Sequence, residues 1–378
     1  MVIRVLVVDD SAVMLRLLSE IINDDPGLQV IATASHGYEA IRKAETLRPD
    51  VITMDVNMPH MDGLKAVEHI MISAPTPIVM ISSLTRKGAE ITLKALDLGA
   101  IDFVSKPSGY VSLDIGDIAH EILSKIKLAA KIRVVGTVKN STITTNSPSL
   151  LRRATLPEPP KRGEDIDIEH AIFRYVLSRS SGNIYNYSRV VAIGCSTGGP
   201  QALNDILLRF PQQFPAPILI AQHMPEKFTE KMAELLDRRA ELHVVEAKRG
   251  MKLQKGLVYI APGAYNLKVL PDRTLALIED NTPSSQPRPS VDMLFISVAA
   301  VFREQAVGVL LTGMGGDGVI GMNAIKDAKG VTIAQDEESS LVFGMPKMAI
   351  ESGCVDSIVP LALMADEIMD SVNMPAKR

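Results

Sequence analysis

Short apolar runs, each followed by a helical pattern, recur through the first third of the chain. The runs cover residues 3–8, 30–34, 51–54, 78–81 and 101–104, and the last helical pattern extends from about residue 113 to 130. Buried parallel strands have this continuous apolar character, and five strand–helix units in succession predict a parallel sheet with helices on both faces. We therefore expect residues 1–130 to form a doubly wound, five-stranded α/β domain.

Polar residues stand at the ends of these runs: Asp9, Asp10, Asp55, Ser82 and Lys106. In a parallel sheet, ligands bind outside the carboxyl ends of the strands, so these side chains are expected to converge. Three crowded carboxylates repel one another unless a cation such as Mg²⁺ neutralises them. A metal-supported aspartate beside a lysine and a hydroxyl suits acceptance of a phosphoryl group. Each residue alone also fits a loop-end cap, but the matched set of five favours a functional site.

Residues 1–125 resemble the receiver domains of two-component response regulators. The resemblance is carried by Asp9-Asp10-Ser11, by residues 54–63 around Asp55, and by Ser82-Ser83 and Ser105-Lys106-Pro107. It implies that Asp55 accepts a phosphoryl group from a histidine kinase and that Asp9, Asp10 and Asp55 surround Mg²⁺. It also implies that Ser82 is the switch hydroxyl and Lys106 the phosphate partner.

The composition changes between residues 131 and 188. A stretch rich in Ser, Thr and Asn at residues 138–150 precedes a charged, proline-rich stretch at residues 156–163. Such segments are typical of flexible, partly extended linkers. Apolar residues spaced through residues 166–177 predict a short amphipathic helix within this linker.

Apolar runs and helical patterns alternate again in residues 189–378. Runs at residues 190–193, 218–221, 242–245, 306–311 and 331–334 predict a second doubly wound α/β domain with a mostly parallel sheet. Three shorter runs, at residues 257–260, 267–270 and 275–278, are separated by turn residues and predict an antiparallel flap.

The first of these runs ends in Gly194-Cys195-Ser196-Thr197-Gly198-Gly199, and Pro200 begins a helix. The segment fits the G-x-S-x-G nucleophile elbow, which leaves the Ser196 hydroxyl at the strand end. The backbone N–H groups of Thr197, Gly198 and Met314 are candidates to stabilise an oxyanion. By itself the pattern fits a tight turn or a phosphate cradle equally well.

His223 and Asp317 follow two other strands of this predicted sheet. A serine hydroxyl becomes nucleophilic when an imidazole removes its proton, and a carboxylate holds the imidazole in the required tautomer. Ser196, His223 and Asp317 therefore predict a catalytic triad at one sheet edge, with Cys195 as an alternative nucleophile. Alone, His223 also fits a helix cap and Asp317 a loop aspartate.

Residues 189–378 resemble the catalytic domain of the CheB family of chemotaxis protein-glutamate methylesterases. The resemblance is carried by residues 193–200, 222–225 and 311–318, with support from residues 288–295 and 335–346. It implies hydrolysis of glutamyl methyl esters on the cytoplasmic helices of methyl-accepting chemoreceptors, with release of methanol and no cofactor for this step. It also implies deamidation of receptor glutamines, and a receiver that covers the active-site face until Asp55 is phosphorylated. Cys195 stands where alanine is usual in this family.

Composition argues against other classes of protein. The formal net charge of −4 gives no general attraction to nucleic acid, and no apolar stretch reaches the roughly 20 residues that span a bilayer. A DNA-binding output would need a basic helix-turn-helix, and a nucleotide phosphate loop would need a glycine spacing that residues 194–199 and 313–318 lack. Two cysteines far apart favour a reducing compartment. We therefore expect a soluble, cytoplasmic hydrolase without direct membrane insertion.

Overall fold

The computed structural model describes residues 2–106, 115–132, 134, 187–279 and 288–374. By its internal contacts the chain divides into one compact unit, residues 1–136 with 187–378, and a second unit, residues 137–186. The second unit, the predicted helix at 166–177 and nearly all of the predicted linker lie outside the described residues. The division into domains at residues 1–130, 131–188 and 189–378 stays a prediction.

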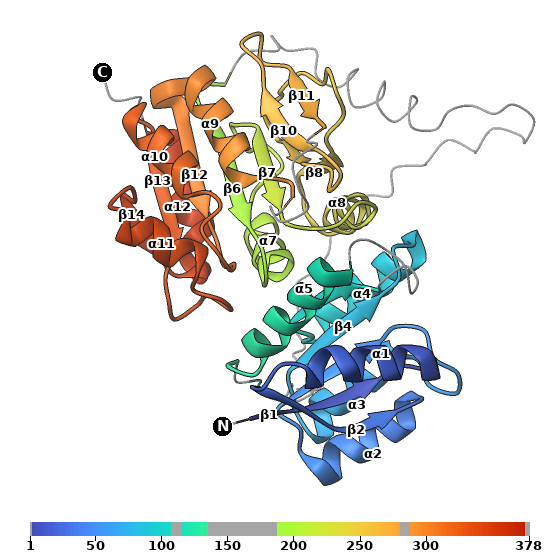
Figure 1. The fold of residues 1–378 in the computed structure, drawn as a ribbon. Helices are drawn as coiled ribbons and strands as arrows, with labels where there is room; N and C mark the ends of the chain where they lie inside the picture. The colour runs from blue at the N-terminus through green and yellow to red at the C-terminus, as the bar shows by residue number, and fades with distance from the viewer. Residues whose placement is uncertain (1, 107–114, 133, 135–186, 280–287, 375–378) are drawn as a thin grey trace, which may run out of the picture. The chain divides into compact units, whose positions relative to one another are not determined.

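The N-terminal sheet has five parallel strands in the order β2-β1-β3-β4-β5. Strands β1, β2 and β4 of this sheet are labelled in Figure 1. The strands are β1 (Ile3–Val8), β2 (Leu28–Ala34), β3 (Val51–Asp55), β4 (Ile78–Ser82) and β5 (Asp102–Ser105). Helices α1 (Ala12–Asn23) and α5 (Ile115–Ala129) pack against one face. Helices α2 (Gly37–Leu47), α3 (Gly63–Ser73) and α4 (Arg86–Asp97) pack against the other. The predicted doubly wound fold is confirmed.

The C-terminal sheet has seven parallel strands in the order β14-β13-β12-β6-β7-β9-β8. The central strands are β12 (Ala306–Leu310), β6 (Val190–Cys195) and β7 (Ile218–Gln222), each of them completely buried. The flanking strands are β13 (Val331–Gln335), β14 (Ser357–Val359), β9 (Leu257–Ile260) and β8 (His243–Glu246). Because every strand runs the same way, all carboxyl ends lie at one edge.

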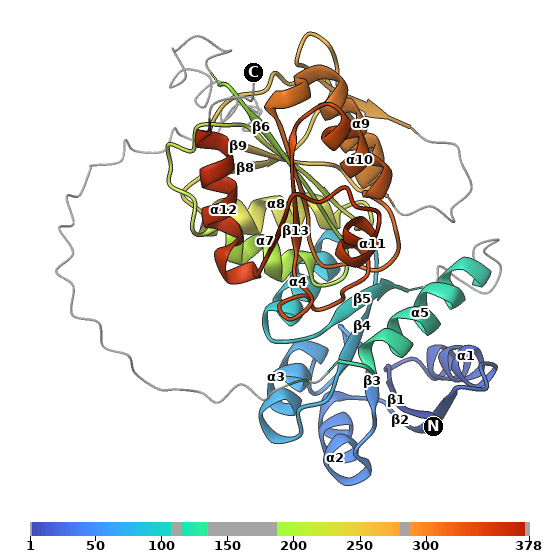
Figure 2. The ribbon, with the colours of Figure 1, turned by 90° about the vertical axis from the view of Figure 1, so that its left-hand side faces the viewer.

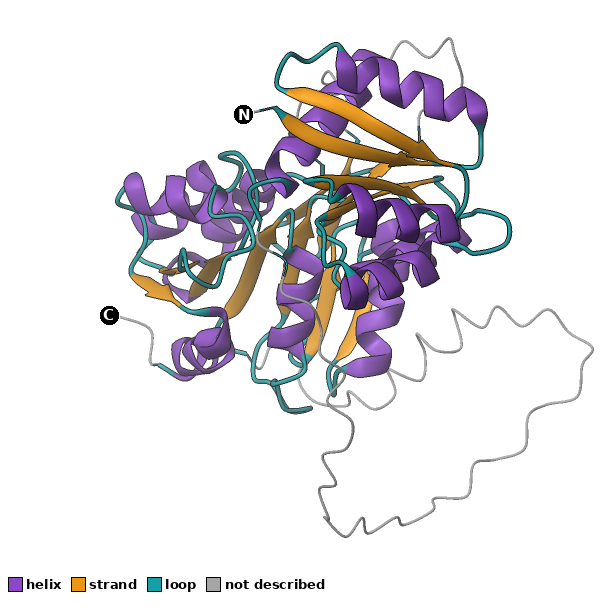
Figure 3. Ribbon diagram, turned by 90° about the horizontal axis from the view of Figure 1, so that it is seen from below, coloured by secondary structure: helices purple, strands orange, loops and turns teal. Residues whose placement is uncertain are grey.

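Helices cover both faces of this second sheet (Figures 2 and 3). Helices α7 (Gly199–Leu207), α8 (Phe228–Arg239) and α12 (Leu361–Asn373) pack on one face. Helices α9 (Val291–Phe302), α10 (Val319–Asp327) and α11 (Met345–Glu351) pack on the other. No helix in the described ranges is long and apolar enough to cross a bilayer.

One topological prediction was wrong. Strands β10 (Asn266–Val269) and β11 (Leu275–Ile278) do pair antiparallel, but β9 lies inside the main sheet between β7 and β8. The physical reason is that β9 is apolar on both faces: Val258 and Ile260 pack in one core, and Tyr259 packs in the other. A strand buried on both faces suits the interior of a parallel sheet and not a flap.

Candidate active site and metal site

The three predicted catalytic residues follow the three central strands of the C-terminal sheet. Ser196 comes directly after β6, His223 directly after β7, and Asp317 lies in the loop that joins β12 to α10. Strand β6 lies between β12 and β7 in the sheet, so these three loops are neighbours at the carboxyl edge. The chain reverses its winding direction at β6, and ligands of open α/β sheets bind at such switch points.

His223 and Asp317 are in direct contact. Nε2 of His223 lies 2.8 Å from Oδ2 of Asp317, and their side chains are only 9% and 12% exposed. Burial acts to raise the pKa of the Asp317 carboxyl. The hydrogen bond and charge of His223, together with the backbone amides of Asp292 and Val291, outweigh this effect and hold the pKa below its usual value. Asp317 is therefore a charged partner for the imidazole.

Groups at the N-terminus of α9 form the other hydrogen bonds of the Asp317 carboxylate. The backbone N–H of Val291 donates to Oδ2 at 2.7 Å, and that of Asp292 donates to Oδ1 at 2.9 Å. The hydroxyl of Ser290, the N-cap of α9, lies 3.2 Å from Oδ1. A helix N-terminus carries partial positive charge, so it fixes and stabilises this carboxylate.

Ser196 lies in a turn that glycines make possible. Gly198 has a φ of +81°, and a Cβ there would lie 2.8 Å from Leu341. A Cβ on Gly313 would lie 2.7 Å from the Cβ of Ser196, so only glycine lets the β12 loop come this close. The backbone N–H of Ser196 donates to the Thr312 carbonyl at 3.0 Å, which joins the turn to that loop.

The structure does not join Ser196 to His223 by a hydrogen bond. In the described part of the chain the Ser196 hydroxyl has no hydrogen-bond partner, although the His223 backbone N–H donates to the neighbouring Cys195 carbonyl at 3.1 Å. Catalytic hydrogen bonds are often long or misaligned before substrate binds. The predicted residues are thus neighbours, and only the His223–Asp317 pair is in contact.

The predicted oxyanion donors stand beside the serine. The amides of Thr197 and Gly198 begin the turn into α7, and the amide of Met314 follows Gly313 in the opposite loop. None of these three amides has a hydrogen-bond acceptor among the described residues. Free N–H groups beside a nucleophile are what an oxyanion requires.

Cys195 is a poor alternative nucleophile. Its side chain is completely buried, and its thiol donates to Oε1 of Gln222 at 3.1 Å. Burial raises the pKa of this thiol far above its usual value. The thiolate is the reactive form of cysteine, so this residue is inert.

Two supporting features escaped the sequence analysis. Nε2 of Gln222 donates to the backbone carbonyls of Ser196 and His223, at 2.9 and 3.0 Å, and so ties the two loops together. The α9 N-terminus that holds Asp317 was likewise missed. Its only sequence signal is the N-cap serine within Arg288-Pro289-Ser290-Val291-Asp292, which marks a helix start but not its target.

The N-terminal sheet brings the predicted carboxylates together. One ligand oxygen each from Asp9, Asp10 and Asp55 lies within 4.8 Å of the others. Nζ of Lys106 lies 2.8 Å from Asp9 and 2.9 Å from Asp55. Burial raises the pKa of Asp55 to about 6, against the opposing effect of Lys106. Oδ2 of Asp55 is buried without a hydrogen-bond partner in the described structure, and this donor set fits a hard divalent cation.

Ser82 occupies the end of β4 but its hydroxyl is not free. It is fully buried and accepts a hydrogen bond from Thr92 of α4 at 2.8 Å. This hydrogen bond joins the end of β4 to α4. No sequence motif marks this contact with Thr92.

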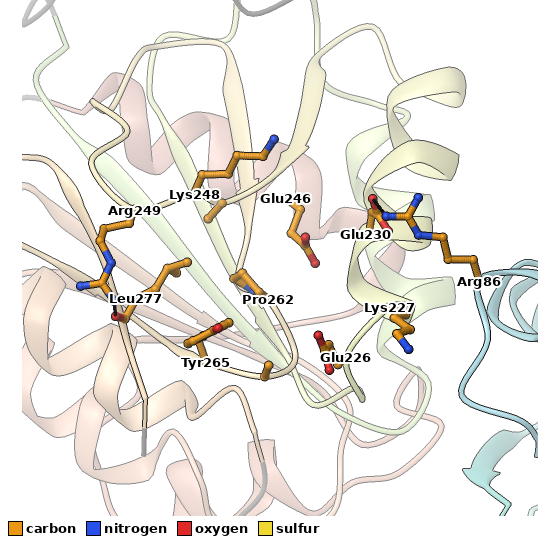
Figure 4. A pocket seen from close by; sticks show the side chains of 12 residues that line it. Arg86, Glu226, Lys227, Glu230, Glu246, Lys248, Arg249, Pro262, Tyr265 and Leu277 are labelled. Carbon is orange, nitrogen blue, oxygen red and sulfur yellow. Dashed lines mark hydrogen bonds and ion pairs between the residues drawn. The ribbon is translucent and has the colours of Figure 1, made fainter. Parts of the chain in front are cut away.

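A charged pocket of about 350 Å³ is lined mainly by residues of the C-terminal part of the chain (Figure 4). Its acidic side chains are Glu226 and Glu230, which follow β7, and Glu246, which ends β8. Burial raises the pKa of Glu246, although Thr229 donates a hydrogen bond to it at 2.6 Å. Arg86 of the N-terminal half reaches this pocket and pairs with Glu230 at 3.1 Å. None of the sequence motifs described above includes a residue of this pocket's acidic set.

Comparison with known proteins covers almost the whole chain. Residues 5–114 match the model of the response regulator receiver domain, and residues 191–368 match that of the CheB methylesterase. A protein-glutamate methylesterase/protein-glutamine glutaminase 2 of Carboxydothermus hydrogenoformans is 44% identical over 98% of this chain and 99% of its own. One of Halalkalibacterium halodurans is 40% identical over 97% of each chain.

A solved structure also resembles the C-terminal part. It is the catalytic domain of the CheB methylesterase of Thermotoga maritima, which is 38% identical and covers 48% of this chain and 97% of its own, with a TM-score of 0.46.

Proposed function

Because this chain belongs to the CheB family of protein-glutamate methylesterases/protein-glutamine glutaminases, we propose that it hydrolyses glutamyl methyl esters on chemoreceptors and deamidates receptor glutamines in chemotaxis. The substrates lie on the cytoplasmic domains of these receptors, and the products of the ester reaction are glutamate and methanol. The contact between His223 and Asp317, one strand away from Ser196, is the observation that carries this proposal.

The chemistry follows from the charged pair. Nε2 of His223 is hydrogen-bonded to Asp317, so Nδ1 is the nitrogen that takes the proton of the Ser196 hydroxyl as Oγ of Ser196 attacks the ester carbonyl. The amides of Thr197, Gly198 and Met314 stabilise the oxyanion. His223 returns the proton to the leaving methoxide, and methanol departs. Water, deprotonated by His223, then hydrolyses the acyl-enzyme and restores the Ser196 hydroxyl. With a glutamine substrate the leaving group is ammonia.

The receiver carries the control site. A histidine kinase supplies the phosphoryl group to Asp55, and Asp9, Asp10 and Asp55 would hold Mg²⁺, which neutralises the approaching phosphate. Lys106 bridges Asp9 and Asp55 and is placed to pair with the phosphate. Burial lowers the pKa of Lys106, but the two carboxylates more than offset this and keep the ammonium charged.

Contacts between the receiver and the nucleophile turn support regulation by phosphorylation. The hydroxyl of Thr197, next to Ser196, donates to Oδ2 of Asp102 on β5. The ring of Phe103 stacks on Phe228 of α8, with ring centroids 4.5 Å apart. Both contacts are made by the first two residues of β5, and β5 pairs with β4, the strand that ends at Ser82. Phosphorylation at Asp55 is proposed to release them and expose Ser196.

The test is methanol release from a methylated receptor, measured on the full chain with and without Mg²⁺ and a small-molecule phosphodonor. We expect phosphodonor to raise the rate in the wild type but not in Asp55→Asn. Ser196→Ala should lose hydrolysis and still accept the phosphoryl group. Hydrolysis at the wild-type rate by Ser196→Ala would refute the mechanism, and equal activation of Asp55→Asn would refute the control site.

A further inference from the structure

Asp292, in the first turn of α9, has a role that neither the sequence analysis nor the proposed triad assigns. Its Oδ1 accepts hydrogen bonds from the backbone N–H groups of Gly318, at 2.9 Å, and Gly321, at 2.7 Å. These amides belong to the start of α10, the helix that Asp317 precedes. Asp292 therefore binds the N-terminus of one helix while its own helix binds the carboxylate of Asp317.

The arrangement is reciprocal. The N-terminus of α9 receives the Asp317 carboxylate through the amides of Val291 and Asp292. The N-terminus of α10 receives the Asp292 carboxylate through the amides of Gly318 and Gly321. The start of α9 is thus capped by Asp317, which precedes α10, and the start of α10 is capped by Asp292, which belongs to α9. A shift of either carboxylate therefore breaks its hydrogen bonds to the helix start that it caps.

Helix α10 depends on this external cap because it has none of its own. Its N-cap is Gly318, which has no side chain to bond the first amides. Glycine is required there, since φ is +101° and a Cβ would lie 2.6 Å from Leu310. Gly321 is equally constrained, because a Cβ would lie 2.4 Å from the Cβ of Phe295 on α9. The close approach of β12 and α9 thus excludes side chains at Gly318 and Gly321, so the first amides of α10 are capped by Asp292.

The charge distribution agrees with separate roles for the two acids. Burial raises the pKa of Asp292, and the nearby Asp317 raises it further, against the effect of the two amides. The pKa of Asp317 is held below its usual value, as described above. Negative charge is thus favoured on Asp317, which contacts the imidazole, while Oδ1 of Asp292 accepts from two backbone amides.

We propose that Asp292 is a positioning residue for ester hydrolysis, which holds Asp317 against His223 by anchoring the start of α10. Asp317 directly precedes Gly318, so one peptide bond joins it to the anchored start of α10. Release of that amide frees the Asp317 backbone to move, and the 2.8 Å contact with Nε2 of His223 depends on its position. This inference rests on the proposed roles of His223 and Asp317.

The test compares Asp292→Asn with Asp292→Ala in the full chain. Asparagine keeps an oxygen that accepts from both amides, and alanine removes it. We expect Asp292→Ala to lose kcat on the order of 100-fold, the cost of a displacement of about 1 Å in an active site, with little change in KM. Asp292→Asn should retain kcat within about tenfold of the wild type, because its side-chain oxygen still accepts from both amides. A tenfold loss of kcat corresponds to a rise of about 1.4 kcal/mol in the activation free energy.

A spectroscopic readout separates positioning from general stability. The proton shared between Nε2 of His223 and Asp317 gives a low-field ¹H resonance, which should persist in Asp292→Asn and be lost in Asp292→Ala. The matched control is Asp356→Ala. Asp356 accepts from the backbone N–H of Thr332 at 3.0 Å, at the amino-terminal end of β13, away from the site. Its loss should lower the melting temperature without changing kcat or the resonance.

The outcomes are distinct. Wild-type kcat in Asp292→Ala, together with loss of activity in Asp317→Ala, would overturn the positioning role and leave the triad intact. Full activity in Asp317→Ala would overturn the proposed function itself. If Asp292→Ala does not fold, Asp292→Ser replaces it, because the shorter hydroxyl side chain does not span to both amides. A wild-type kcat and low-field resonance in that variant would likewise overturn the proposal.

Discussion

His223 pairs with Asp317 through Nε2, with 2.8 Å between the nitrogen and Oδ2, so Nδ1 is the ring nitrogen that remains for proton transfer. The carboxylate accepts, so the neutral imidazole must carry its proton on Nε2. We predict that ¹⁵N NMR of the resting protein shows a protonated Nε2 and an unprotonated Nδ1 at His223. A protonated Nδ1 with a bare Nε2 would contradict the assigned roles of the two nitrogens.

The neighbouring residues Ser196 and Cys195 should differ sharply as targets of mutation. Ser196→Ala removes the proposed nucleophile and is expected to lower kcat by roughly 10⁴-fold or more, the usual cost of losing a catalytic serine. Cys195→Ala should retain most of the activity, because the buried thiol bonds only to Gln222. Methanol release from methylated receptor measures both. The reverse order of effects would transfer the nucleophile to Cys195.

Asp317 should make folding stability depend on pH in the acidic range. Its folded-state pKa lies below the ordinary value of 3.8, so its stabilising contribution is present above that value and is lost as pH falls through the folded pKa. Near neutral pH, the free energy of unfolding measured with urea should therefore be larger for the wild type than for Asp317→Asn. This difference should shrink as the pH drops below 3.8. A difference that stays constant into acid would show that the charge is not stabilised in the fold.

An ion pair between the two halves of the chain offers a test of the proposed covering role of the receiver. Arg239 of α8 binds Asp97 of α4 in a bidentate manner, at 2.6 and 3.2 Å. Such a partly exposed pair contributes at most about 1 kcal/mol, so Asp97→Arg should raise unphosphorylated activity by up to about fivefold. Arg239→Asp should do the same, and the double exchange should return activity toward wild type.

Lys43→Ala is the control for this exchange. Lys43 pairs with Glu39 within α2, at 2.7 Å, and its loss should leave basal activity unchanged. Additive increases in the double exchange, instead of recovery, would rule out this contact as part of the cover.

The acidic cluster of the receiver should bind Mg²⁺ measurably. Added Mg²⁺ is expected to raise the melting temperature of the wild type, because a ligand that binds only the folded state stabilises it. Asp10→Asn removes one of the three carboxylates and should reduce this shift. Asp24→Asn, which changes an exposed carboxylate just after α1, should keep it. Equal shifts in all three proteins would place the metal elsewhere.

Local patterns in the sequence were sufficient to predict most strands and the residues at their ends. Continuous apolar runs predict buried strands, and Ser196, His223 and Asp317 were identified because each follows such a run. The position of β9 was mispredicted because a four-residue apolar run fits a flap and a central strand equally well. Strand β14 and helices α11 and α12 were not predicted at all.

The sequence by itself determined the alternation of strands and helices and the chemical types at the strand ends, because these depend on neighbouring residues alone. Only the tertiary structure decided that β6 lies between β12 and β7, that α9 caps Asp317 and that Asp292 caps α10. Strand order and helix-to-loop hydrogen bonds join residues that are far apart along the chain. Their energy comes from packing and from buried polar groups that need partners, which no local pattern records.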